Sequence, residues 1–142
     1  MVAFAACAPT LGLAAEAADI AGRWYAQDSD LRTRRALIVI ASDGHQLVGT
    51  VDVIFAKPGE DPDPVCSECE GPDHNRKIRG LAILFLGDIG TNGEYRGRIL
   101  DPEEGKVYRC VATPDPGGRK LSIRGYVGIP LLGRTETWVR AP

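Results

Sequence analysis

Two cysteines spaced as Cys-x-x-Cys, Cys66 and Cys69, are the residues of this sequence best suited to chemistry. Such a pair can catalyse thiol–disulfide exchange, bind a metal ion or form a structural disulfide. Redox catalysis requires a stabilised thiolate, normally provided by a helix N-terminus or a cationic neighbour. Here Glu68 lies between the cysteines and Glu70 follows them, so the local negative charge disfavours the thiolate and a redox centre.

A zinc site is the second interpretation of the cysteine pair. It would combine Cys66 and Cys69 with His74 and with Cys110, because thiolates and imidazoles are the ligands that zinc prefers. The spacing matches only half of a usual zinc motif. We therefore expect no metal site.

Other catalytic machinery is not indicated. The two histidines, His45 and His74, lie beside a turn and in a long irregular segment, and no nucleophile elbow accompanies either of them. The sequence also has no glycine loop of the kind that binds phosphate groups before a helix. We expect a protein that is not an enzyme and that uses no cofactor.

The arginines offer a binding chemistry instead, because they outnumber lysines thirteen to four. Four of them fall on candidate strands: Arg96, Arg98, Arg109 and Arg124. Guanidinium groups facing an interior would anchor a carboxylate or a phosphate. We favour the alternative, in which these arginines lie on a solvated outer face.

Length and composition limit the fold. A chain of 142 residues with 25% charged side chains and a net charge of −2 fits one small soluble domain. The charge lacks the strongly basic balance of a dedicated nucleic-acid binder. Seventeen glycines and ten prolines favour short elements separated by turns over long helices.

The N-terminal segment predicts export. Residues 1–17 are rich in alanine, and Ala15-Glu16-Ala17 has the small-x-small pattern that a signal peptidase cleaves, although the usual basic residues are missing. We expect a signal peptide over residues 1–17 and one domain over residues 18–142, in the periplasm or secreted. The segment is too short to span a bilayer. Lipid anchoring at Cys7 and an apolar helix packed on the domain are the alternatives.

In an oxidising compartment a structural disulfide is the favoured interpretation of the cysteines. Three of them follow residue 17, so one disulfide leaves one free thiol. A Cys66–Cys110 disulfide would close a loop of about 45 residues and stabilise the fold by about 4 kcal/mol on the chain-entropy model. A Cys66–Cys69 disulfide would close a small ring and contribute less. The residues alone leave both pairings open.

Alternation of apolar and polar residues, together with turn residues such as Thr91-Asn92-Gly93, predicts an all-β domain without a helix of ten residues or more. The eight expected strands are Arg23–Gln27, Arg35–Ala41, Gln46–Phe55, Arg79–Gly87, Glu94–Leu100, Lys106–Thr113, Lys120–Val127 and Arg134–Arg140. Eight short antiparallel strands would leave exposed edges unless they close into a barrel. We expect a single antiparallel eight-stranded barrel, with a flattened sandwich as the alternative.

The longest irregular segment runs from Ala56 to Lys77 and contains four prolines and six acidic residues. A loop of this length in a compact domain is usually functional or disordered. It is either a lid over the mouth of the barrel or a solvated excursion held by a disulfide.

Several motifs together resemble a bacterial family catalogued as domain of unknown function 2147. They are Gly22-Arg23-Trp24, Cys66-Ser67-Glu68-Cys69, the hairpin segment 101–108, Arg124-Gly125-Tyr126-Val127-Gly128, and residues 132–140. The resemblance covers residues 20–140. It implies a small exported protein of the bacterial envelope with a lipocalin-like (calycin) barrel, and it carries no activity. Because the Cys-x-x-Cys motif belongs to the resemblance as a unit, it favours a Cys66–Cys69 disulfide.

The lipocalin comparison assigns structural roles to residues at both ends of the domain. In lipocalins a Gly-x-Trp on the first strand places an indole at the closed end of the barrel, under an arginine of the last strand. Gly22 and Trp24 would take this role here, with Arg134 or Arg140 over the indole and Trp138 in the core. Such a cation–π contact is worth about 0.5–2 kcal/mol.

We therefore expect an exported barrel that binds a small apolar or amphipathic molecule. The alternative is a structural or interaction module of the envelope with a filled barrel and a protein partner. An interior volume of about 300 Å³ or more would favour a pocket of ordinary ligand size. The candidate interior residues are Val39, Leu81, Ile83, Tyr108, Leu121 and Ile123.

Overall fold

The computed structural model describes residues 20–28, 30, 32–90 and 92–142, apart from the side chains of residues 88 and 132. The expected signal peptide over residues 1–17, with Cys7, lies outside the described residues.

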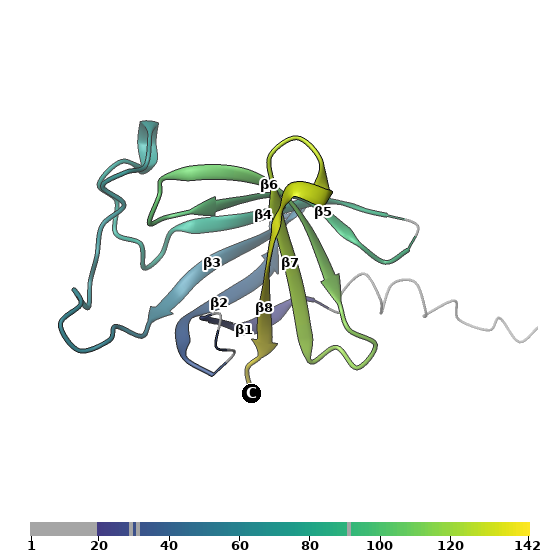
Figure 1. Ribbon diagram of the computed structural model, residues 1–142, viewed down its shortest axis with the longest axis horizontal. Helices are drawn as coiled ribbons and strands as arrows, with labels where there is room; N and C mark the ends of the chain where they lie inside the picture. The colour runs from purple at the N-terminus through teal and green to yellow at the C-terminus, as the bar shows by residue number, and fades with distance from the viewer. Residues whose placement is uncertain (1–19, 29, 31, 91) are drawn as a thin grey trace, which may run out of the picture.

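Eight antiparallel strands and two short 3-10 helices make up the regular structure of the described residues (Figure 1). They are β1 (Gly22–Gln27), β2 (Arg34–Ser42), β3 (Leu47–Ile54), η1 (Gly71–Asp73), β4 (Ala82–Ile89), β5 (Tyr95–Asp101), β6 (Lys106–Pro114), β7 (Lys120–Tyr126), η2 (Pro130–Leu132) and β8 (Arg134–Arg140). The strands form a closed barrel in sequence order. The predicted barrel is confirmed, and the sandwich is not what forms.

Closure depends on pairing between the first and last strands, which lie side by side in Figure 1. Trp24 pairs with Arg140, and Tyr25 pairs with Val139. This short seam removes the edges that an open sheet of this length would expose.

The fourth strand begins later than the sequence predicts. The expected start was Arg79, but Arg79 and Gly80 form a turn, and Gly80 adopts a φ of +93° that favours glycine. The Gly80 amide donates to the carbonyl of Val51, and the Leu81 amide donates to that of Ile78. The extended pairing can therefore begin only at Ala82.

One end of the barrel is closed around Trp24, which is fully buried. Its indole N–H donates to the carbonyl of Ile20 at 2.9 Å, and the guanidinium of Arg140 lies over its ring. Arg140 also donates to the carbonyls of Ala21 and Gly118. The predicted contact is confirmed for Arg140, whereas Arg134 lies at the opposite end because β8 runs the length of the barrel.

The main core lies inside the barrel, next to this closed end. It consists of aliphatic and aromatic side chains from all eight strands, including Ile38, Ile40, Leu84, Leu86, Tyr95, Leu100, Ala112, Leu121, Ile123 and Trp138. Cys110 on β6 is a buried free thiol in the same cluster.

Candidate ligand-binding cavity

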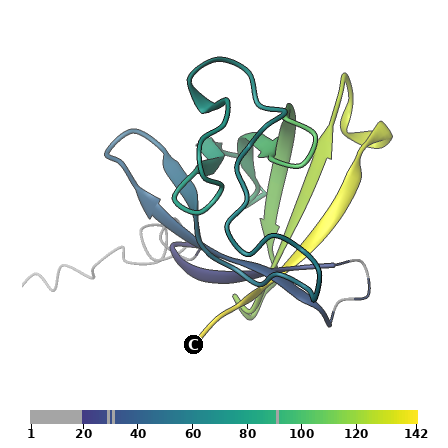
Figure 2. The same ribbon diagram turned by 90° about the vertical axis from the view of Figure 1, so that its left-hand side faces the viewer.

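A cavity of about 720 Å³ opens at the end of the barrel opposite Trp24. Its walls come from the ends of the strands and from four connections, those of β1–β2, β3–β4, β5–β6 and β7–β8. Figure 2 faces this side of the molecule and shows the teal β3–β4 loop lying between the β2–β3 and β7–β8 sides of the barrel. The volume falls within the range of sites that hold drug-sized ligands.

The deeper wall is apolar. It is formed by apolar side chains of seven strands and one loop residue: Ala26, Ala36, Ile38, Val51, Ile54, Ile78, Ile83, Ile99, Leu100, Ile123 and Trp138. An apolar molecule that left water for this wall would gain about 25 cal/mol per Å² of surface buried.

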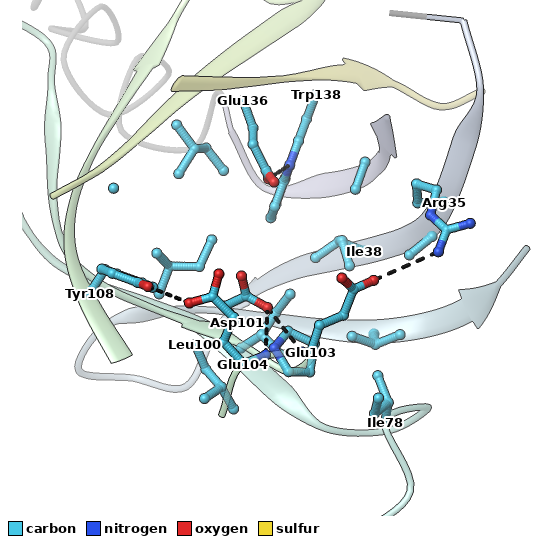
Figure 3. Close-up of a pocket in the computed structure, with 18 of the residues that line it drawn as sticks. Arg35, Ile38, Ile78, Leu100, Asp101, Glu103, Glu104, Tyr108, Glu136 and Trp138 are labelled. Atoms are coloured by element: carbon cyan, nitrogen blue, oxygen red, sulfur yellow. Dashed lines mark hydrogen bonds and ion pairs between the residues drawn. The ribbon is translucent and has the colours of Figure 1, made fainter. Parts of the chain in front are cut away.

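Polar side chains line the mouth, and acidic groups dominate among them (Figure 3). The lining contains seven carboxylates, from Asp28, Glu60, Asp61, Asp101, Glu103, Glu104 and Glu136, against two guanidinium groups, from Arg35 and Arg134. Tyr108 donates its hydroxyl to Glu104 at 2.7 Å, and this hydrogen bond raises the pKa of Tyr108.

Arg35 on β2 connects three segments at the mouth. Its guanidinium pairs with Glu60 of the long loop at 2.9 Å, Asp28 after β1 at 3.4 Å, and Glu103 of the β5–β6 turn at 3.7 Å. The bond from Arg35 lowers the pKa of Glu60 to about 2. Arg35 therefore anchors the long loop at the cavity mouth.

The part of the long β3–β4 loop that contains Cys66 and Cys69, here called the cysteine loop, packs on the β5–β6 turn. Cys66 and Cys69 form a disulfide, and the Cys66 sulfur lies 3.3 Å from the carbonyl oxygen of Pro102. A Cβ atom at Gly105 would overlap the Glu68 carbonyl, so the two segments are in close backbone contact. The long loop therefore forms part of the rim of the cavity and also contains a disulfide. It has features of both structures that the sequence left open, the lid and the excursion held by a disulfide. Within the described part of the chain, no cluster of three metal-ligating side chains occurs.

Of the six predicted interior residues, Ile83, Tyr108 and Ile123 line the cavity. Leu81 and Leu121 are buried in the core without lining it.

The structure does not place Val39 in the interior, where the sequence predicted it. Val39 pairs with the exposed Arg23 and faces outward. Its neighbour Ile38 pairs with the buried Trp24 and lines the cavity instead. The run from Ala36 to Ala41 is apolar on both faces, so alternation alone does not identify the inward one.

Glu136 is the site residue that sequence reasoning missed. It pairs with Ile123, lines the cavity, and accepts a hydrogen bond from the indole N–H of Trp138 at 3.2 Å. A signal was present, because Arg134, Glu136, Trp138 and Arg140 alternate along one face of β8.

The four arginines predicted on strands do not line the cavity, in agreement with the outer-face position that we expected from the sequence. Arg98 stacks on the Phe85 ring at 4.5 Å, and Arg124 donates to the carbonyls of Pro130 and Leu131. Arg96 and Arg109 are exposed. These groups do not supply an interior anion site.

The fold has a counterpart among solved structures. The structure titled "Protein HP1028 from the human pathogen Helicobacter pylori belongs to the lipocalin family" matches with a TM-score of 0.70 and 18% sequence identity, covering 87% of this chain and 83% of the other. The likeness shows a lipocalin-like fold. No curated protein matches this sequence. Among the described residues, no helix has the length and apolar character needed to cross a membrane.

The family resemblance of the sequence motifs is confirmed, since the family model described as "Uncharacterized protein conserved in bacteria (DUF2147)" matches residues 22–140. That range runs from the first residue of β1 to the last residue of β8. The chain therefore belongs to the DUF2147 family of bacterial proteins.

Proposed function

We propose that this protein binds a small amphipathic molecule in its barrel cavity. The observation that carries the proposal is the cavity itself, whose deeper wall is apolar and whose mouth is polar. Such a site removes an apolar tail from water and leaves a polar head near solvent. A barrel filled by its own side chains, the basis of the interaction-module alternative, would lack this space of about 720 Å³.

Filling the cavity tests the proposal. Ala36 faces the cavity, whereas Ala41 on the same strand is exposed and lies outside its lining. Native mass spectrometry of the protein isolated from its own bacterium should show a retained adduct. We expect Ala36→Phe to abolish the adduct and Ala41→Phe to retain it. No adduct, together with no thermal stabilisation by a broad panel of amphiphiles, would overturn the proposal.

The proposed function includes export from the cytoplasm. The Cys66–Cys69 disulfide supports this, because structural disulfides persist in oxidising compartments. Cell fractionation with an antibody to the protein is the test. Recovery in the cytoplasmic fraction with both thiols reduced would contradict export without affecting the binding proposal.

A further inference from the structure

The charge of the cavity lining restricts the ligands that it can hold. Seven carboxylates line it, against two guanidinium groups. Arg35 pairs with Glu60, Asp28 and Glu103, and Lys57 pairs with Asp28, so these groups largely neutralise one another. The remaining carboxylates of the lining are those of Asp61, Asp101, Glu104 and Glu136. Arg134 remains as the other cationic group of the lining. The field inside the mouth is therefore negative.

Glu136 places a negative charge on the inward face of β8, at an exposed position that is open to the cavity. It is paired in register with the buried Ile123, and the next inward residue on β8 is the buried Trp138. One carboxylate oxygen accepts the indole hydrogen bond. Glu136 forms no ion pair within the described residues, and its indole hydrogen bond is the one side-chain hydrogen bond that it makes among them.

The cavity lining also contains a buried acceptor that has no donor among the described residues. Gln27, on the neighbouring strand β1, also lines the cavity, and its Oε1 is buried without a hydrogen-bond partner among the described residues. An acceptor without a donor is costly, and a donor supplied by a ligand would relieve that cost. The aromatic faces of Trp138 and Tyr108 add surfaces that attract cations.

From this arrangement we infer that the cavity selects amphiphiles with a cationic head, held beside Glu136 with the tail against the apolar wall. The inference rests on the proposed function and adds the sign of the ligand's charge. An anionic amphiphile such as a fatty acid would meet the same carboxylates and be repelled.

Three probes with ten-carbon chains test the charge: decyltrimethylammonium, 1-decanol and decanoate. Their dissociation constants are measured by calorimetry on the full chain, below the micelle concentration, at neutral pH and low salt. We expect decyltrimethylammonium to bind at least about tenfold more tightly than decanoate, a difference of about 1.4 kcal/mol. Added salt should reduce the difference, because it screens the mouth carboxylates.

Glu136→Gln is the decisive variant, since it removes the charge and retains the shape. It should raise the dissociation constant of decyltrimethylammonium about tenfold and change that of 1-decanol less than twofold. Asp52→Asn is the matched control, because Asp52 is an exposed acid that does not line the cavity. If Glu136→Gln does not fold, Glu104→Gln at the mouth tests the same field. It should raise the dissociation constant of decyltrimethylammonium about threefold.

The outcomes separate the two proposals. Tighter binding of decanoate, or equal binding of all three probes, overturns the charge inference and leaves a binding cavity. If Glu136→Gln keeps the full preference for decyltrimethylammonium over decanoate, the charge inference is also overturned and a binding cavity remains. If none of the probes binds and no adduct is retained from the cell, the proposed function fails and the inference fails with it.

Discussion

Arg140 and Trp24 are direct partners across the β1–β8 seam, and the guanidinium carbon of Arg140 lies 4.2 Å from the centroid of the indole ring. The same guanidinium donates to the carbonyls of Ala21, just before β1, and Gly118, in the β6–β7 turn. One side chain thus joins the first strand, the last strand and the β6–β7 turn. The closed end of the barrel depends on it.

Replacing Arg140 should destabilise the barrel. We expect Arg140→Met to lower the free energy of unfolding by about 2–4 kcal/mol, because it removes a cation–π contact and two charge-assisted hydrogen bonds. Urea unfolding followed by tryptophan fluorescence measures the change. Arg79→Met, at an exposed turn residue, is the control and should shift stability by less than about 0.5 kcal/mol. Equal effects of the two substitutions would contradict the role of Arg140.

Gly105 should be intolerant of a side chain. It has a φ of +70°, and a Cβ atom there would overlap the backbone of Glu68. Gly59 provides a matched control, with a φ of +86° and no atom within 4 Å of an added Cβ. Both alanine variants incur backbone strain, but only Gly105→Ala separates the cysteine loop from the β5–β6 turn. We expect Gly105→Ala to be the less stable by about 1–3 kcal/mol in urea unfolding. Equal stabilities would argue against this packing.

The ion pair between Arg35 and Glu60 should make the loop sensitive to acid. The pKa of Glu60 is lowered from 4.5 to about 2, so its contribution is complete above pH 4.5 and is lost as the pH falls towards 2. Hydrogen exchange of residues 57–64, corrected for intrinsic rates, should accelerate over that range. In Arg35→Met the exchange should already be fast at pH 6, whereas Arg79→Met should behave as wild type. A loop that exchanges equally at pH 6 and pH 3 would exclude this anchor.

The buried thiol of Cys110 should make stability fall at high pH. Burial raises the pKa of Cys110 from 9.0 to about 12, so the unfolded chain ionises this thiol before the folded one does. Between pH 9 and 12 the free energy of unfolding should therefore decrease by about 1.4 kcal/mol per pH unit from this group. Cys110→Ala should lack that part of the slope. Identical slopes in the two proteins would show that Cys110 is not buried as described.

Labelling provides an independent check on the three cysteines. Iodoacetamide should modify Cys110 only after unfolding, and Cys66 and Cys69 only after reduction, as read from peptide masses. Modification of Cys110 in the native protein would contradict its burial.

Local sequence patterns determined the architecture of this protein. Alternation along segments such as Lys120–Val127 and turn residues such as Pro114-Asp115-Pro116-Gly117-Gly118 specify eight short strands, because side-chain direction and turn conformation depend on near neighbours. The closure of such a sheet follows from the cost of open edges. Closure and the family resemblance predicted Arg134 or Arg140 over Trp24, and the structure selects Arg140.

Only the tertiary structure decided which residues form the cavity. Whether Ile38 or Val39 faces inward depends on strand register, and a run that is apolar on both faces carries no signal for it. The volume of the cavity depends on how side chains from eight strands meet, and the mouth charges come from segments as distant as Asp28, Glu60 and Glu103. Proximity of this kind arises from long-range packing, which a local pattern does not encode.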